Sequence, residues 1–282
     1  MRPHQWTKNA LLFAALLFAK RLFVWSDDLK TVAGFGIFCL LSSAVYIVND
    51  LIDLEKDRQH PTKKTRPFAA GDVSRGAGIA FLAMLLAAAI PASFALARPF
   101  GTTALAYLAL QVAYSLSLKN VVILDVLLVA TGFVLRAVAG AQAISVFISP
   151  WLIVCTMLLA LFLGLSKRRA EIVLLSDKAA DHRGALAHYS PYLLDQMISV
   201  VTASTVMAYG LYTLWPVPGH AFRQEPLYLT IPFVMYGIFR YLYLIHHREQ
   251  GGNPSQVLLS DRPLLAAIFL WALAVVAILY FF

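Results

Sequence analysis

Long apolar runs, separated by short polar stretches, constrain this chain more than any other feature of its sequence. About 20 residues are needed for one crossing of a bilayer, and nine runs are predicted to cross it. They cover residues 9–25, 28–53, 75–97, 100–118, 121–144, 149–175, 191–214, 226–247 and 262–282. None shows the alternation of a strand, and a segment inside lipid must satisfy its own backbone hydrogen bonds. The sequence therefore predicts an all-α integral membrane fold of nine transmembrane helices, with residues 1–282 forming a single polytopic domain.

The composition excludes a water-soluble enzyme. Hydrophobic residues make up 60% of the chain and charged residues 13%, and the mean hydropathy is +0.72; in soluble domains about a quarter of the residues are charged. No polar stretch has the composition of a separate extramembrane domain, so membrane lipid is the expected surrounding and no nucleic-acid partner is expected. Cys39 and Cys155 lie inside apolar runs and imply no disulfide framework. The first run lacks a small-residue cleavage site and is expected to be a retained helix.

Positive charge is concentrated on one side of the predicted bundle. Sixteen of the 23 lysines and arginines fall on the side that holds the loop between the second and third runs and the loop between the sixth and seventh. By the positive-inside rule this side is cytoplasmic. The N-terminus is then expected on the cytoplasmic side of the cell membrane and the C-terminus on the opposite side. Most acidic residues share that side. A reaction site is therefore expected to open to the cytoplasm.

The strongest local pattern is acidic and lies at the inner end of the second run. At about 100° per residue, Asn49, Asp50, Asp53 and Asp57 fall within one arc of a helix, whereas Glu55 points away. Like charges at this spacing repel one another and are costly near hydrocarbon. Mg²⁺, which prefers carboxylate oxygens and substrate phosphates, is the expected compensating ion. The alternative is a solvated helix end whose acids pair with nearby cations, namely Lys56, Arg58 or Lys63.

The Asn-Asp-x-x-Asp-x-x-x-Asp pattern of residues 49–57, followed by the His-Pro-Thr-Lys-Lys-Thr-Arg-Pro segment 60–67, resembles the UbiA superfamily of intramembrane prenyltransferases. The resemblance implies a UbiA-type bundle around a central cavity open to the cytoplasm. Within that superfamily the chain is most similar to the branch of decaprenyl-phosphate phosphoribosyltransferases. The segments that carry this likeness are Gln5-Trp6-x-Lys8-Asn9, Tyr114-x-x-x-Leu118-Lys119, Arg136-Ala137-x-Ala139-Gly140, Lys167-Arg168-Arg169-Ala170-Glu171 and Asp261-Arg262.

This resemblance implies a membrane-embedded glycosyltransferase of cell-wall biosynthesis. It would transfer a 5-phosphoribosyl group from phosphoribosyl diphosphate to a polyprenyl phosphate such as decaprenyl phosphate, with Mg²⁺ as cofactor and diphosphate as the leaving group. The catalytic, metal-binding residues are then Asp50, Asp53 and Asp57. The substrate-binding residues are expected to be Lys8, Asn49, Lys63, Arg66, Tyr114, Lys119, Arg136, Lys167, Arg168, Glu171 and Arg240.

Several of these residues have a chemical reason of their own. Glu171 lies at i+4 from Lys167 and i+3 from Arg168, so it can orient two cations toward the 5-phosphate of the donor, although the run also suits a positive-inside anchor. Arg136 lies well inside the fifth run, where an arginine is a functional candidate. It shares a helix face with Asp125, and that face is expected to line the cavity. Arg136 then either contacts an anion or pairs with a polar group of another helix.

Two other functions stay open. Asp177 and Asp181 have the Asp-x-x-x-Asp spacing of a second metal motif, which would favour an ordinary prenyltransferase that joins a prenyl diphosphate to an aromatic acceptor. Intramembrane arginines also suit an anion or lipid transporter, but the charges cluster at one face and no paired broken helices are evident. Prenyl chain length, association into a homo-oligomer and a second metal at Asp177 and Asp181 stay undecided by the sequence.

Overall fold

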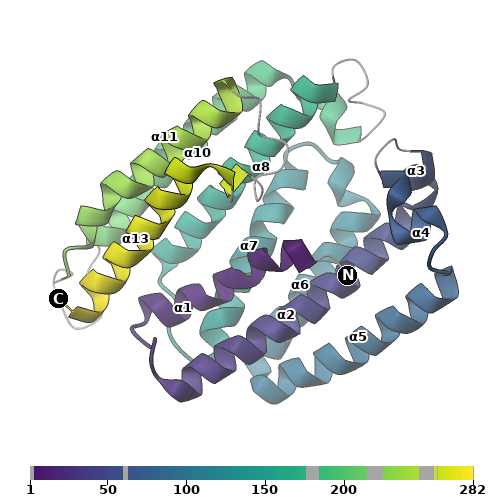
Figure 1. Cartoon of the computed structure of the whole chain (residues 1–282), viewed down its shortest axis with the longest axis horizontal. Coiled ribbons are helices and arrows are strands. Elements are labelled where there is room, and N and C mark those ends of the chain that lie inside the picture. The colour runs from purple at the N-terminus through teal and green to yellow at the C-terminus, as the bar shows by residue number, and fades with distance from the viewer. Residues whose placement is uncertain are drawn as a thin grey trace. The chain divides into compact units, whose positions relative to one another are not determined.

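The computed structural model describes residues 3–59, 63–175, 184–214, 225–247, 257–258 and 260–281. Those residues form helices joined by turns and short connections, and no strand occurs among them (Figure 1). The all-α prediction is confirmed for this part of the chain. Asp177, Asp181 and the side chain of Lys63 lie outside the described residues.

The helices follow the predicted apolar runs closely. They are α1 (Leu12–Phe18), α2 (Trp25–Ile52), α3 (Leu54–Gln59), α4 (Pro67–Ala70), α5 (Arg75–Leu96), α6 (Arg98–Leu116), α7 (Leu124–Ala143), α8 (Pro150–Leu175), α10 (Pro191–Leu214), α11 (Ile231–His247) and α13 (Arg262–Phe281). Short 3-10 segments cover Pro3–Leu11, Lys63–Thr65, Leu118–Asn120, Gly184–His188 and Leu227–Thr230.

In the part of the chain that the structure describes, seven helices are long and apolar enough to cross a membrane. They lie at 25–52, 75–96, 124–143, 150–173, 191–214, 227–247 and 262–281. The other two predicted spans differ for separate reasons. The 9–25 run is divided between a 3-10 segment and the seven-residue α1, and α6 is long enough at 19 residues but less apolar than the seven.

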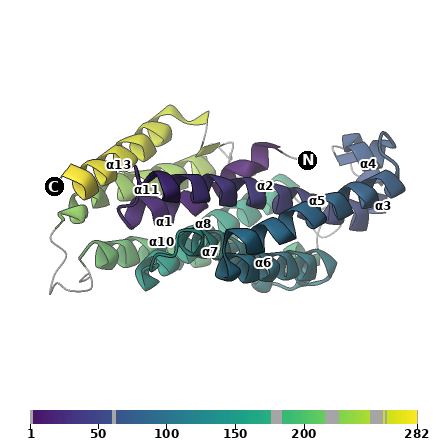
Figure 2. The same ribbon diagram turned by 90° about the horizontal axis from the view of Figure 1, so that it is seen from below.

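The chain divides into two compact units, and α7 contributes to both. The first comprises residues 1–119 and 132–148. Within it α2 packs against α1, α5 and α6, and Figures 1 and 2 both show α2 and α5 side by side. Its core is aromatic at the centre, where the rings of Phe38 and Phe100 meet edge to face at 5.6 Å and Tyr107 lies 5.2 Å from Phe38.

The second unit comprises residues 120–131 and 149–282. Here α8 packs along α10, α10 contacts α11, and α11 packs against α13. Phe162 of α8 and Tyr241 of α11 are fully buried, with ring centroids 5.3 Å apart. At the start of α13 the carboxylate of Asp261 accepts the backbone N–H of Leu264 at 2.9 Å and so caps the helix.

Gly140 of α7 lies where the backbone of α1 comes very close to α7. A Cβ added at Gly140 of α7 would lie 2.1 Å from the carbonyl oxygen of Leu12, whereas a Cβ at Gly36 of α2 would meet nothing within 4 Å. A clash with backbone is relieved only by moving α1 away from α7. The absence of a side chain at Gly140 therefore allows α1 to lie directly against α7.

We expect Gly140→Ala to lower the free energy of unfolding by about 1–3 kcal/mol, the usual cost of overpacking. The measurement is thermal unfolding of the detergent-solubilised protein. Gly36→Ala is the matched control, because it adds the same methyl group to a helix in open space. Equal unfolding temperatures for the two variants would contradict the close contact.

Candidate active site

The acidic residues at the inner end of α2 keep the spacing that the sequence predicted. The helix is interrupted at Asp53, between α2 and α3, but backbone bonds from Asp53 N to Asn49 O (2.9 Å) and from Asp57 N to Asp53 O (2.8 Å) keep the residues four apart on one side. Asp50 and Asp57 are buried. Glu55 is exposed on another side, where it pairs with Arg58 of the same helix and with Arg75 at the start of α5.

Two cations from later segments neutralise the buried acids. Nη1 of Arg66 donates to Oδ1 of Asp50 at 3.1 Å and to Oδ2 of Asp57 at 2.5 Å. Nζ of Lys119 lies 2.7 and 2.9 Å from the two carboxylate oxygens of Asp53. Like charges near hydrocarbon must be compensated, and these contacts compensate them. The acids are therefore paired with Arg66 and Lys119, and the side chains of Lys56 and Lys63 lie outside the described residues.

The donor set of this acidic cluster suits a hard divalent cation in part. The carboxylates of Asp50 and Asp57 converge on one guanidinium nitrogen of Arg66, so the position between them already holds positive charge. Carboxylate oxygens are also the ligands that Mg²⁺ prefers. Asp53 turns to Lys119 instead. Among the described residues no three acidic, histidine or cysteine side chains are close enough to hold a metal ion as they stand. The metal set of Asp50, Asp53 and Asp57 stays a prediction.

Arg136 is buried inside the first unit and all three of its nitrogens have partners. It donates from Nε to Oδ1 of Asn9 (2.9 Å), from Nη1 to the carbonyl of Gly132 (2.9 Å) and from Nη2 to the hydroxyl of Tyr107 (2.8 Å). Its guanidinium also lies over the rings of Tyr107 and Phe133. Of the two roles that the sequence left open, the structure supplies the pairing with polar groups of other helices. Contact with an anion stays a prediction.

The second unit contains the other predicted charged cluster. Nη1 of Arg168 lies 2.5 Å from Glu171, and Nζ of Lys167 lies 3.8 Å from the other oxygen of the same carboxylate, so the predicted pairing along the helix is present. Nε of Arg168 also donates to Oδ2 of Asp125 at 2.8 Å. Spacing along the chain does not predict this pair, although a buried arginine requires an acidic partner and Asp125 lies in the first turn of α7.

Asp125 is fully buried and is held by a second group as well. The phenol of Tyr189 donates to its Oδ1 at 2.9 Å and accepts the backbone N–H of Ile123 at 2.6 Å. Burial, reinforced by the adjacent carboxylate, raises the pKa of Tyr189 to about 12, so the phenol stays a donor at neutral pH. The expectation that Asp125 lines a cavity is therefore wrong, because its two oxygens are enclosed by Arg168 and Tyr189.

The remaining predicted residues are placed more simply. Lys8, Asn49 and Tyr114 are half-buried. Arg240 forms a two-pronged ion pair with Asp261, with bonds of 3.1 and 2.8 Å, which ties α11 to the start of α13. This pair explains Arg240 structurally, and its predicted contact with substrate stays untested.

Comparisons with known proteins agree with one another. The model of the UbiA prenyltransferase family matches residues 10–273. The chain is 34% identical to the decaprenyl-phosphate phosphoribosyltransferase of Corynebacterium glutamicum, over 99% of this chain and 85% of that protein, and 30% identical to that of Mycolicibacterium smegmatis, over 100% and 91%. A solved structure of a UbiA homolog from Archaeoglobus fulgidus bound to GPP and Mg²⁺ has a TM-score of 0.74 at 19% identity, covering 98% of this chain and 96% of that one.

We expect Asp125→Asn to lower the free energy of unfolding by about 3–5 kcal/mol, because it leaves a buried guanidinium without its closest partner on α7. Unfolding in detergent measures this directly. Glu55→Gln breaks an exposed ion pair and serves as the control, with an expected loss of about 1 kcal/mol or less. A similar small loss for both variants would show that the Asp125 pair does not support the fold.

Proposed function

This chain belongs to the UbiA prenyltransferase family, and from that premise we propose that it transfers the 5-phosphoribosyl group of phosphoribosyl diphosphate to a polyprenyl phosphate. It is a membrane-embedded transferase. The names of its relatives support the phosphoribosyl donor and the polyprenyl acceptor. The observation that carries the proposal is the acidic cluster itself, in which three carboxylates at the end of a membrane helix are balanced by Arg66 and Lys119.

Transfer requires that the bond between the anomeric carbon and the diphosphate oxygen breaks while a bond to the acceptor phosphate oxygen forms. The acceptor phosphate is already ionised, so no protein nucleophile is needed and the protein acts by positioning and neutralising charge. Mg²⁺ held by Asp50, Asp53 and Asp57 would stabilise the leaving diphosphate as a Lewis acid. Arg66 and Lys119 are the cations next to those acids, and we assign them to the diphosphate oxygens.

The second cluster suits the 5-phosphate of the donor. Lys167 is half-exposed, and Glu171 holds it beside Arg168. Arg168 is fixed by Asp125, and Asp125 by the protonated phenol of Tyr189. This chain of bonds keeps the guanidinium from rearranging when an anion binds. Lys167 and Arg168 are therefore our candidates for the donor's phosphate monoester.

We infer that the site faces the cytoplasm and that residues 1–282 act as a single transferase domain in the cell membrane. The charge of the loops supports this orientation, since the topology predicted from the sequence puts most cations of the chain on the side of the acidic cluster. A water-soluble, multiply charged donor must also reach the site without crossing hydrocarbon.

The test is a reconstitution with two arms. Purified protein and Mg²⁺ are incubated with phosphoribosyl diphosphate and polyprenyl phosphate, and in parallel with a prenyl diphosphate and 4-hydroxybenzoate. The masses of the products are then read. A phosphoribosyl polyprenyl phosphate in the first arm supports the proposal. A prenylated aromatic acid in the second arm alone, or no product in either, would overturn it.

We expect Asp50→Ala, Asp53→Ala and Asp57→Ala each to abolish turnover with little loss of folded protein, because each removes a metal ligand but also relieves repulsion between acids. Activity should vanish in EDTA and return with added Mg²⁺. Asp72→Ala is the control, because this exposed acid follows α4 and is not one of the three acids of the cluster. Near-normal turnover in two of the three cluster variants would count against the metal assignment.

The two enzyme candidates differ at the end of α8, where Lys167 lies, and in the residues that follow this helix. If Lys167 binds the donor, Lys167→Ala should weaken phosphoribosyl diphosphate binding about tenfold to a hundredfold, the cost of a lost charged contact, and Asp177→Asn should change little. If the protein is an ordinary prenyltransferase, the Asp177→Asn variant should be inactive and the Lys167→Ala variant should keep its turnover. Donor affinity and turnover of the two variants distinguish these cases.

A further inference from the structure

Arg66 contacts the acidic cluster through a single nitrogen. Its Nη1 lies 3.1 Å from Oδ1 of Asp50 and 2.5 Å from Oδ2 of Asp57, so one atom bridges two carboxylates. An arginine more often meets one carboxylate with two parallel N–H groups, because the guanidinium is a planar fork. A single positive atom between two carboxylates is instead the arrangement found around a bound divalent cation. Arg66 therefore occupies the position that such a cation needs if both acids are its ligands.

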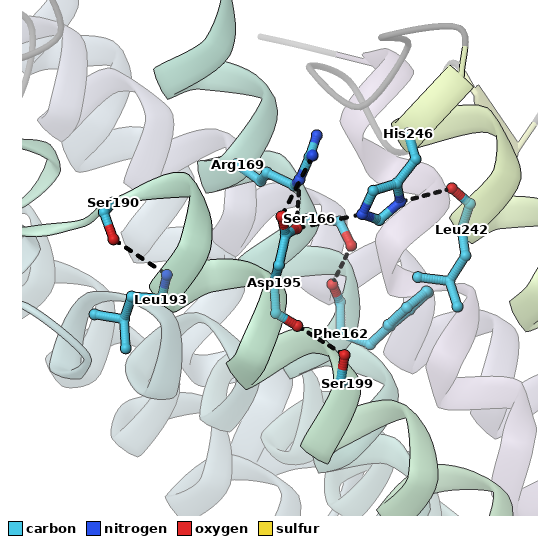
Figure 3. A network of polar contacts seen from close by, with 9 residues as sticks. All are labelled: Phe162, Ser166, Arg169, Ser190, Leu193, Asp195, Ser199, Leu242 and His246. Atoms are coloured by element: carbon cyan, nitrogen blue, oxygen red, sulfur yellow. Dashed lines mark hydrogen bonds and ion pairs between the residues drawn. The ribbon is translucent and has the colours of Figure 1, made fainter.

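Arginines of the second unit bind their acids in the usual, forked way. Arg240 approaches the two oxygens of Asp261 with Nε and Nη2, at 3.1 and 2.8 Å. Figure 3 shows Arg169 turning the same two nitrogens toward the oxygens of Asp195, at 2.5 and 3.5 Å. In both pairs the arginine lies on one helix and the acid lies on, or directly before, another. These pairs tie helices together, whereas the bridge at Arg66 gathers two acids that are close in sequence.

Lys119 holds the third acid of the cluster in a similar manner. Its Nζ lies 2.7 and 2.9 Å from the two oxygens of Asp53, between them, as a cation chelated by one carboxylate does. Bonds from Mg²⁺ to its oxygen ligands are only about 2.0–2.1 Å long, so the ion and a nitrogen cannot share one position. A divalent cation bound through these same oxygens must therefore displace Arg66 and Lys119.

Both cations are carried by short connections, and both can leave the acids by side-chain motion alone. Arg66 directly precedes α4, its backbone is extended as is usual before a proline (φ −67°, ψ 143°), and its carbonyl accepts the N–H of Ala70 at 2.8 Å. Lys119 belongs to the 3-10 segment Leu118–Asn120. The two side chains are 24% and 14% exposed, so each already reaches solvent. Their release requires no movement of a long helix.

We propose that Arg66 and Lys119 are exchangeable counterions of the acidic cluster. They neutralise the acids until a divalent cation binds, and that cation displaces them toward the diphosphate of the donor. The exchange keeps the acids compensated at every stage. It also accounts for the finding that no three acidic, histidine or cysteine side chains among the described residues are arranged to hold a metal as they stand. The proposal rests on the proposed function, which assigns the metal and the diphosphate to this cluster.

Chemical modification measures the release of Arg66 directly. Purified full-length protein is treated with phenylglyoxal, which reacts with accessible guanidinium groups, with and without Mg²⁺, and the modified arginines are quantified by mass spectrometry. Arg75 is the control in the same sample, because its side chain is 65% exposed and pairs with Glu55, outside the cluster. Without Mg²⁺ the 24% exposed Arg66 should react more slowly than Arg75, and with Mg²⁺ its rate should rise to about that of Arg75. Inorganic diphosphate added with Mg²⁺ should slow Arg66 again.

An Arg66 rate that Mg²⁺ leaves unchanged or lowers would overturn the proposal, because Arg66 would then stay beside the acids when the metal is bound. An equal rise at Arg75 would overturn it as well, since that would show a general loosening of the protein. The experiment uses the unmodified sequence, so it does not depend on the folding of a variant.

Affinities test the same exchange from the side of the metal. By titration calorimetry, Arg66→Gln should bind Mg²⁺ about tenfold more tightly, because no guanidinium has to leave, and should bind inorganic diphosphate with Mg²⁺ about tenfold more weakly, because a charged contact is lost. Arg75→Gln is the matched control and should change neither affinity. Unchanged or weaker Mg²⁺ binding by Arg66→Gln, in protein shown to be folded by thermal unfolding, would overturn the proposal.

Neither experiment contains phosphoribosyl diphosphate or a lipid, so the exchange and the proposed function fail separately. A protein that releases Arg66 on Mg²⁺ binding yet transfers no phosphoribosyl group would refute the proposed function and not the exchange. A protein that transfers the group while Arg66 stays protected in Mg²⁺ would refute only the exchange.

Discussion

Carboxylates beside hydrocarbon need opposite charge close by, and this requirement organises the polar end of the first unit. Asp50 and Asp57 at the end of α2 draw in Arg66, and Asp53 draws in Lys119 from beyond α6. Arg66, which directly precedes α4, is therefore held against the end of α2. Without these contacts the acids would repel one another and the connections that carry the cations would lose their anchor.

The same requirement brings polar groups of the first run and of α6 into the core of the first unit. Arg136 is a cation in an apolar core, and its partners Asn9 and Tyr107 come from the first run and from α6. Thr103 of α6 also binds the Gln142 side chain, at 2.6 Å. Polar groups buried in this way need hydrogen-bond partners inside the protein, so these two segments supply partners as well as apolar surface.

The sequence predicted what depends on local geometry and missed what depends on packing. Helix period placed the three acids together and Glu55 apart, and placed Glu171 beside Lys167 and Arg168, as the structure has them. Which cation pairs with which acid is decided by contacts between residues far apart in the chain, so Lys119 was predicted for substrate rather than for Asp53. The pair between Arg168 and Asp125 could not be read from spacing for the same reason.

Electrostatics also restricts the order in which the proposed substrates bind. Three carboxylates with Arg66 and Lys119 carry a formal charge of about −1, from −3 and +2. A cluster of that charge repels a diphosphate. A divalent cation changes the total to about +1, so the same residues then attract it. Under the proposed function, a divalent cation would therefore have to bind before or together with the donor, and Asp50, Asp53 and Asp57, which hold Arg66 and Lys119 in this structure, would be the residues that bind it.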